Sequence, residues 1–339
     1  MLPTGFTAAR HAAPTQKPSD ATLLTLSGPQ VQPLLKPDEV LEAVREAFVL
    51  HSSGKGRVFP VVRERLDTGG TFGIKSGDVQ DEALLGFKAA GFWHANRSVG
   101  GEPHQATVML FDPATGRPLC IVDGNAITTA RTGAAGKLGL QTLARPDSKR
   151  LCVFGSGVQA RVQLDLALDV FREIEIVRYV TSRGKPDTDF EAAFAGRCAL
   201  KHSIDPNEAV SESDIVITAT PGSGPLFSAD AVRPGTHINA VGTDTKGKRE
   251  LPEGILQKAR IFVDDKTQSR QIGEGQWGDK QDEIEIGRIL AGEIEVSRQP
   301  DDITLFDMTG LALQDLTVAR MLYQRALADG HGTPIAWPW

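Results

Sequence analysis

Residues 151–160 read LCVFGSGVQA, and this stretch decides the fold of the second half of the chain. The four apolar residues are typical of a buried strand, and the glycine-rich turn after them leads into a helix with an apolar stripe. Gly155 permits a tight turn, Gly157 lets a pyrophosphate approach the backbone, and Ala160 allows the helix to pack closely on the strand. A second apolar strand follows at residues 175–181. The pattern predicts a dinucleotide-binding βαβ unit. The alternative is an ordinary strand–turn–helix whose glycines serve packing alone.

The composition narrows the classes of protein to consider. A chain of 339 residues is expected to form two domains, and a net charge of −6 without a basic run argues against a nucleic-acid partner. No apolar run is long enough to cross a membrane, and residues 1–20 lack the apolar core of a secretion signal, so we expect a loose tail there. Cys120, Cys152 and Cys198 stand far apart, with no metal-ligand spacing around them. We therefore expect buried thiols, a cytoplasmic location and no metal.

The first half of the chain has the pattern of an antiparallel β structure. A helix is predicted from Pro37, because proline is tolerated in a first turn and the acidic residues after it complement the helix dipole. Alternating and apolar runs separated by turn residues then predict a series of strands. The candidate strands of this half are residues 22–26, 58–65, 71–75, 84–93, 105–111 and 119–122.

The second half alternates between strands and helices. A long helix at residues 125–144 links it to the first half, and the apolar helix at residues 311–327 is expected to pack back on the first domain. The predicted strands are residues 151–154, 175–181, 215–220, 237–241, 261–264 and 303–306. Such alternation predicts an α/β fold with a doubly wound parallel Rossmann sheet, beside an α+β domain formed by the first half and the closing helix. We assign residues 131–309 to the Rossmann domain and residues 1–130 with 310–339 to the α+β domain.

Three basic residues stand in otherwise apolar or small-residue runs. Lys75 and Lys88 lie inside predicted strands, and Arg131 is the only charge in the run ITTARTGAA at residues 127–135. A buried cation needs an anionic partner, so each is a candidate substrate ligand, with Arg131 forking onto a carboxylate or phosphate. The alternatives are an internal salt bridge or a snorkelling edge residue for the lysines, and an exposed helix residue for Arg131.

Asp244 follows the buried strand at residues 237–241. In an open α/β sheet, ligands lie beyond the carboxyl ends of the strands, so a proton donor or acceptor is useful at this place. The alternative is an aspartate that caps a turn or helix.

These residues together resemble the ornithine cyclodeaminase/mu-crystallin family, over about residues 40–320. The Arg-Thr run around Arg131 and the run HINAVG at residues 237–242 are specific to that family, whereas the glycine fingerprint is not. The matching stretches are residues 88–96, 104–108, 110–112 with Gly116, 127–135, 155–160, 237–244 with 247–251, and 306–307 with Gly310.

The resemblance implies an N-terminal domain that binds substrate and forms a homodimer, a Rossmann domain, and a C-terminal helix that returns to the first domain. It implies that Lys88 is the active-site lysine, that Arg57 and Arg131 bind the substrate carboxylate, and that Asp244 is the acid/base. The resemblance also implies that Met308 lies near the nicotinamide, and there this chain departs from the family, which often has serine at this position. The residues expected to bind the cofactor are His104, Arg131, Thr132, Gly155, Gly157, Val158, Gln159, Ala160, Ser182, Arg183, Thr220, Val241, Lys248 and Met308.

Family members reduce imines, deaminate alanine oxidatively or cyclise ornithine to proline, and others act as binding proteins without catalysis. Cyclising members typically carry asparagine three residues after the active-site lysine, and here Gly91 stands in that place. The pattern around it is more similar to members that reduce iminosuccinate to aspartate. We therefore predict an NAD(P)H-dependent reductase of a small 2-imino acid, with ornithine cyclodeamination as the alternative. The intact set of Lys88, Arg131 and Asp244 argues against a purely binding protein.

Two finer expectations concern the ligands. The second strand of the dinucleotide unit ends in Thr181-Ser182-Arg183 without an acidic residue, which favours NADP(H) over NAD(H); the alternative is that Arg183 stacks on adenine and both cofactors work. Lys75, His94 and Arg57 add basic groups beyond the shared set, and at least one of them is needed if the substrate carries a second carboxylate.

Overall fold

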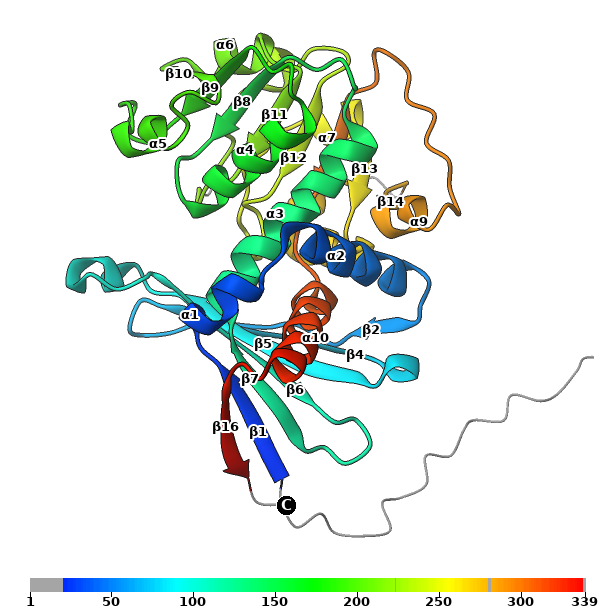
Figure 1. Ribbon diagram of the computed structural model, residues 1–339. Helices are drawn as coiled ribbons and strands as arrows, with labels where there is room; N and C mark the ends of the chain where they lie inside the picture. The colour runs from blue at the N-terminus through cyan, green and yellow to red at the C-terminus, as the bar shows by residue number, and fades with distance from the viewer. Residues whose placement is uncertain (1–20, 223, 280–281, 338–339) are drawn as a thin grey trace, which may run out of the picture.

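The computed structural model describes residues 21–222, 224–279 and 282–337. The described residues form two sheets of eight strands each, one above the other in Figure 1, with helices packed between them. No helix among the described residues is long and apolar enough to span a bilayer. The N-terminal segment expected to be a loose tail lies outside the described residues.

The second sheet is parallel throughout and has the strand order β10-β9-β8-β11-β12-β15-β13-β14. Its first five strands follow the Rossmann order, with the switch point between β8 and β11, and β15 then lies between β12 and β13; this order confirms the predicted doubly wound fold. The central strands are buried, as expected for a sheet covered on both faces. The strands are β8 (Arg150–Phe154), β9 (Ile176–Val180), β10 (Ala199–His202), β11 (Ile215–Thr218), β12 (His237–Ala240), β13 (Arg260–Val263), β14 (Ile284–Glu285) and β15 (Thr304–Asp307).

Helices cover this sheet, but most of them are short. The longest is α4 (Val158–Val170), which begins at the glycine-rich turn as predicted. The others are α5 (Thr188–Ala193), α6 (Pro206–Ser211), α7 (Ile255–Lys258), α8 (Lys266–Ile272) and α9 (Ile286–Leu290). Strands β10 and β14 were not predicted, because one is a half-exposed edge strand with alternating burial and the other has only two residues.

The first sheet is mostly antiparallel, with the order β16-β1-β7-β6-β5-β4-β2 and with β3 paired to β4. Its exception is β1, which runs parallel to β7. The predicted strand at residues 58–65 is two strands, because Pro60 between them has no N–H for the ladder. The strands are β1 (Ala21–Leu26), β2 (Gly56–Val58), β3 (Val62–Arg65), β4 (Thr71–Val79), β5 (Leu84–Phe92), β6 (His104–Phe111), β7 (Pro118–Asp123) and β16 (Thr333–Trp337).

The long helix α3 (Gly124–Leu143) runs from the first sheet to the second. Asp123 caps its start, accepting a hydrogen bond from the N–H of Asn125 at 2.7 Å. Small residues along the helix allow close packing: a Cβ on Gly133 would lie 2.8 Å from Leu166 of α4. The absence of large side chains in this run therefore reflects helix packing.

Helices α2 (Pro37–Ser52) and α10 (Ala312–Asp329) pack together between the sheets. Phe48 of α2 meets Phe306 of β15 edge to face, with 6.2 Å between the ring centroids. Residues of both sheets thus share one apolar core, which includes Val108 of the first sheet and Phe306 of the second. Helix α10 returns to the first sheet, as the apolar pattern at residues 311–327 predicted.

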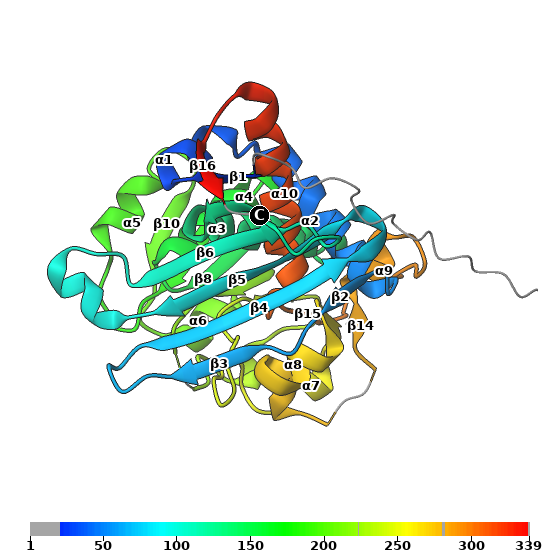
Figure 2. The same ribbon diagram turned by 90° about the horizontal axis from the view of Figure 1, so that it is seen from below.

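Among the described residues, the other face of the first sheet carries no helix, as Figure 2 shows for strands β4, β5 and β6. Its central side chains are apolar and only half buried, among them Ile74, Phe87, Met109 and Ile121. Phe87 and Ile121 both pair with Met109 in the register, so these side chains form one patch. We call these four residues the open-face patch.

Candidate active site

Two lysines and an arginine meet on the covered face of the first sheet. Lys75 of β4 and Lys88 of β5 are register partners, so their side chains leave the sheet on the same face. Arg131 reaches the same place from α3. Their exposed fractions are only 8%, 5% and 8%, respectively. Three buried cations in one place need a compensating negative charge.

The compensating anion is Asp315 of α10, which was not among the predicted residues. Lys88 Nζ lies 2.9 Å from Asp315 Oδ1 and 2.8 Å from Oδ2, and Arg131 Nε lies 3.1 Å from Oδ1. The Asp315 side chain has no exposed surface. Asp315 lies in the first turn of α10, where an acidic residue is common, so only its apolar neighbours in the sequence could have marked it as buried.

Backbone carbonyls complete this cluster. Lys75 Nζ donates to the carbonyl oxygens of Thr309 and Gly310, both at 2.7 Å. Gly310 has a φ of +80°, and a Cβ there would lie 2.7 Å from Arg131 Nη1, so the position requires glycine on both counts. Arg131 Nη1 donates to Gln314 Oε1 at 3.0 Å. Among the described residues, nothing accepts a hydrogen bond from Arg131 Nη2, which is left for a ligand.

Crowding shifts the titration of both lysines. Burial and the Arg131 guanidinium lower the pKa of Lys88 to about 7, although Asp315 raises it. Burial and the Arg63 guanidinium lower the pKa of Lys75 to about 8. Burial raises the pKa of Asp315, but the charges of Lys88 and Arg131 outweigh it and hold that pKa below its usual value. Asp315 is therefore ionised at neutral pH, and Lys88 is poised to gain or lose a proton.

Asp244 follows β12 of the second sheet and contacts the first sheet through Arg63. Arg63 Nη2 lies 3.3 Å from Asp244 Oδ2 and 3.2 Å from the Asp244 carbonyl oxygen. Lys248 Nζ lies 3.5 Å from Asp244 Oδ1. The crowded surroundings raise the pKa of Asp244, but the charges of Lys248, Arg63 and Lys75 together hold it well below its ordinary value. A carboxylate that stays ionised thus lies beside the cation cluster.

The structure does not bring Arg57 to this cluster, contrary to the prediction. Arg57 of β2 pairs with Asp78 of β4, and Arg57 Nε donates to Asp78 Oδ1 at 2.8 Å. Asp78 lies three residues after Lys75, so alternation along the strand directs Asp78 and Arg57 to the opposite face of the sheet. Arg63, which was not predicted, is the arginine that lies near Asp244.

The glycine-rich turn has the shape that a dinucleotide requires. Gly155 has a φ of +103°, and a Cβ there would lie 2.7 Å from the Ala219 carbonyl oxygen. Gly157 is the N-cap of α4, and a Cβ at this residue would have no atom of the described residues within 4 Å, so a phosphate can approach the helix N-terminus. Gln159 Oε1 is buried without a partner among the described residues, so it could accept a hydrogen bond from a ligand. These residues fit the nicotinamide dinucleotide that the fold implies.

Glu250 shapes the neighbouring part of the same edge and was also missed. Its carboxylate accepts hydrogen bonds from Thr218 Oγ1 at 2.8 Å, from the hydroxyl and N–H of Thr220 at 2.7 and 2.6 Å, and from the N–H of Gly242 at 2.8 Å. The ends of β11 and β12 are thereby held together. The sequence analysis gave this residue no role, because its partners come from two other segments that lie apart in the sequence.

The other predicted residues divide into two groups. His104, Thr132, Val241 and Met308 are buried or half buried; the pKa of His104 is lowered by burial and by Lys88, which shows that it shares the electrostatic surroundings of the cluster. Val158, Ser182 and Arg183 are exposed beside the glycine-rich turn. His94 instead packs its ring on Phe92 of β5, with 4.6 Å between the centroids.

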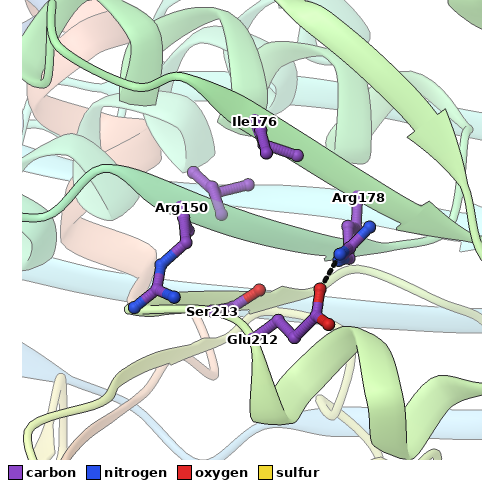
Figure 3. Close-up of a pocket in the computed structure, with 6 residues that line it drawn as sticks. Arg150, Ile176, Arg178, Glu212 and Ser213 are labelled. Atoms are coloured by element: carbon purple, nitrogen blue, oxygen red, sulfur yellow. Dashed lines mark ion pairs between the residues drawn. The ribbon is translucent and has the colours of Figure 1, made fainter.

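A hollow on the second sheet lies away from this site. Figure 3 shows that Arg150, Arg178 and Glu212 line it, with an ion pair between Arg178 and Glu212. Arg150 begins β8, so the hollow lies at the amino ends of the strands. The glycine-rich turn lies at the opposite, carboxyl end of β8, so the hollow takes no part in the candidate site.

Known proteins resemble this chain over nearly its whole length. Alanine dehydrogenase of Archaeoglobus fulgidus is 35% identical over 92% of this chain and 98% of its own. Iminosuccinate reductase of Paracoccus denitrificans is 33% identical over 91% of this chain and 98% of its own. The structure of that reductase in complex with NAD⁺ has a TM-score of 0.85 at 32% identity, covering 94% of this chain and 100% of the other.

A third relative comes from Thermococcus litoralis. Its Delta(1)-pyrroline-2-carboxylate reductase, solved with NADH and L-proline, has a TM-score of 0.84 at 31% identity and covers 92% of this chain and 100% of the other. A family model also matches residues 23–330. With this match and this fold, the chain belongs to the ornithine cyclodeaminase/mu-crystallin family.

Proposed function

We propose that this protein is an NAD(P)H-dependent imine reductase that forms a small L-amino acid from a 2-imino acid. The observation that supports this most is that the Lys88–Arg131–Asp315 cluster lies near Asp244 at the carboxyl edge of the Rossmann sheet, because Lys75 interacts electrostatically with both Arg131 and Asp244. An imino acid offers a carboxylate to the cations and a nitrogen to Asp244.

The class of enzyme is firmly supported. The chain is an NAD(P)-dependent oxidoreductase acting on CH–NH or CH–NH₂ groups, as predicted, because its relatives are named reductases and dehydrogenases of this kind. Among them are an iminosuccinate reductase, pyrroline-2-carboxylate reductases and a ketimine reductase. The substrate within this class is our proposal.

The residues of this chain supply binding and charge. Arg131 Nη2 and the Lys88 ammonium hold the substrate carboxylate, which orients the α-carbon. The ionised Asp244 stabilises the protonated imine, whose positive charge makes the carbon a better hydride acceptor. When bound, the reduced nicotinamide supplies that hydride. The turn at Gly155 and Gly157 and the edge built by Glu250 would hold its dinucleotide.

A second substrate carboxylate would find cations here. Arg63 pairs with Gly73, two residues before Lys75, so both side chains lie on the covered face. Arg63 Nε is buried without a partner among the described residues, and Lys75 Nζ uses two of its three donors on carbonyl oxygens. We therefore propose a dicarboxylate, such as iminosuccinate, which is reduced to aspartate. Arg63 replaces Arg57 in this proposal, since Arg57 faces the other side of the sheet.

We make two further proposals, one on the choice between NADP(H) and NAD(H) and one on how the subunits assemble. Ser182 and Arg183 are exposed after β9, where an adenosine 2′-phosphate would lie, so we propose a preference for NADP(H), with NAD(H) as the alternative.

We propose a homodimer formed through the open-face patch, which is too apolar to favour exposure to water. A related archaeal alanine dehydrogenase is described as a dimer. We propose that residues 1–130 with 310–339 form the substrate-binding and dimerisation domain and that residues 131–309 form the Rossmann domain.

The direct test is a panel of 2-oxo acids, each mixed with ammonia or methylamine, with NADPH or NADH consumption followed by absorbance. The proposal expects stoichiometric consumption and formation of the matching amino acid. Failure of every imine, together with ammonia release from ornithine, would favour cyclodeamination instead. If pyruvate with ammonia is turned over better than oxaloacetate with ammonia, the dicarboxylate part fails while the reductase part stands.

A further inference from the structure

We propose that Asp315 is a positioning residue that holds the Lys88 ammonium and the Arg131 guanidinium side by side, so that both face one substrate carboxylate. This role rests on the proposed function and deepens it. Asp315 itself is not expected to touch the substrate, because its side chain is fully buried and its carboxylate is engaged by the two cations.

The geometry of Arg131 supports this role. Asp315 Oδ1 binds Nε of the guanidinium at 3.1 Å, and Gln314 Oε1 binds Nη1 at 3.0 Å. These contacts fix the plane of the guanidinium and engage its Nε and Nη1 nitrogens. Nη2 remains as the donor available to a ligand, so the adjacent pair of α10 residues determines which part of Arg131 faces the substrate.

The position of Lys88 also depends on Asp315. Its ammonium lies within 2.9 Å of both Asp315 oxygens and 3.4 Å from Thr128 Oγ1. Asp315 Oδ1 is thus shared between Lys88 and Arg131. Two cations would otherwise repel each other in a buried place, and a shared carboxylate removes that cost. The substrate carboxylate then meets a pre-arranged pair of cations, which lowers the cost of ordering them on binding.

The charge of Lys88 is set by its neighbours on four elements. The charged or titratable groups around it are Lys75 on β4, His104 on β6, Arg131 on α3 and Asp315 on α10. Of these, Asp315 is the one that raises the pKa of Lys88, which burial and Arg131 lower to about 7. Without the Asp315 carboxylate, Lys88 would lose its proton at a lower pH and would be neutral at pH 7.

The test measures ligand binding, which does not depend on turnover. Pyruvate serves as the carboxylate probe and is titrated into protein saturated with oxidised cofactor, between pH 5.5 and 9. In the wild type, affinity is expected to fall as pH rises through about 7, the pKa of Lys88. In Asp315→Asn, the midpoint of that fall should move down by about one pH unit or more, and the Kd at pH 7 should rise about 10-fold.

A matched variant controls for damage to the helix. Thr317 lies on the same helix as Asp315, and Thr317→Val removes its buried hydrogen bond of 2.8 Å to the Ala43 carbonyl oxygen of α2. It should leave the midpoint unchanged. If Asp315→Asn weakens binding equally at every pH, or shifts nothing, Asp315 has only a structural role and the proposal is wrong.

A second variant covers the case in which Asp315→Asn does not fold. Asp315→Glu keeps the charge but moves the carboxylate by one methylene group. The pH midpoint should stay near that of the wild type, while the pyruvate Kd rises about 5-fold because Arg131 is displaced. An unchanged Kd would contradict the positioning role. Pyruvate binding without reduction of any imine by the wild type would instead overturn the proposed function and leave this inference standing.

Discussion

Arg63 Nη2 lies 3.3 Å from Asp244 Oδ2, and this contact joins the first sheet to the carboxyl edge of the Rossmann sheet. Arg63 comes from β3 and Asp244 from the loop after β12, so the two halves of the chain meet at the candidate site. In the proposed reaction, the substrate contacts the cation cluster on one side and the dinucleotide on the other. It must therefore bind at this junction. Variants on either side of the junction should therefore affect substrate binding or reduction.

Asp244→Asn should lose most of kcat for imine reduction, about 100-fold or more, while cofactor still binds. The amide keeps the shape of the carboxylate but cannot stabilise a positive charge on the imine nitrogen. Steady-state kinetics and cofactor fluorescence titration measure the two effects. The control is Asp230→Asn, an exposed aspartate paired with Lys258, which should behave as the wild type. Retention of kcat by Asp244→Asn would refute its role.

Arg63→Ala should raise KM for a dicarboxylic imine about 10- to 100-fold, with a smaller effect for the imine of pyruvate. The reason is loss of the second carboxylate's cation, together with a weaker hold on Asp244. Arg57→Ala is the matched control. Arg57 of β2 and Arg63 of β3 both lie on strands that pair with β4, but Arg57 binds Asp78 on the opposite face of the sheet. If Arg57→Ala changes KM more than Arg63→Ala does, the reassignment is wrong.

Arg183→Ala should lower kcat/KM for NADPH about 10-fold and leave that for NADH nearly unchanged. The exposed guanidinium is proposed to pair with the 2′-phosphate, which NADH lacks. Initial rates with each cofactor at fixed imine give the two values, and Arg172→Ala, exposed on the same domain, serves as the control. Equal losses for both cofactors would indicate stacking on adenine and would remove the proposed preference.

The stability of the protein should depend on pH through His51. His51 Nε2 lies 2.9 Å from Asp265 Oδ2, and although burial lowers the pKa of His51, Asp265 outweighs it and the pKa is raised above the ordinary 6.5. A raised histidine pKa means that the stabilisation is fully present below pH 6.5 and is lost as pH rises through the folded-state pKa.

Denaturant unfolding tests this. His51→Gln should reduce the free energy of unfolding by about 1 kcal/mol at pH 6 and by much less at pH 8.5. His331→Gln, at an exposed histidine, should show no such pH-dependent difference. A larger loss for His51→Gln at pH 8.5 than at pH 6 would show that the ion pair does not stabilise the fold.

Local patterns predicted the fold well, because apolar periodicity and glycine turns act within one segment. The stretch at residues 151–160 and the helix from Pro37 have the predicted structure. Strand β16 was not predicted: all of its residues are on the surface, it contains Pro334, and it pairs with β1 from the other end of the chain. Pairings of this range leave no local signal.

The site was predicted less completely than the fold, for a related reason. Lys75, Lys88, Arg131 and Asp244 were evident as charges in apolar or strand-end positions. Asp315 depends on which face of α10 meets the cluster. The choice between Arg57 and Arg63 depends on the break at Pro60 and on the alternation of β4, which decides the face of each side chain. Such information exists only once strands are paired.

Quantifying the products of the reaction is the most direct test of the proposal that this protein reduces a 2-imino acid. Purified protein is incubated with oxaloacetate, ammonia and limiting NADPH, and separately with ornithine and a catalytic amount of NAD⁺, and amino acids and ammonia are quantified. Imine reduction predicts one aspartate formed for each NADPH consumed, and no proline or ammonia from ornithine. Proline and ammonia released from ornithine, with no NADPH consumed in the first mixture, would contradict it.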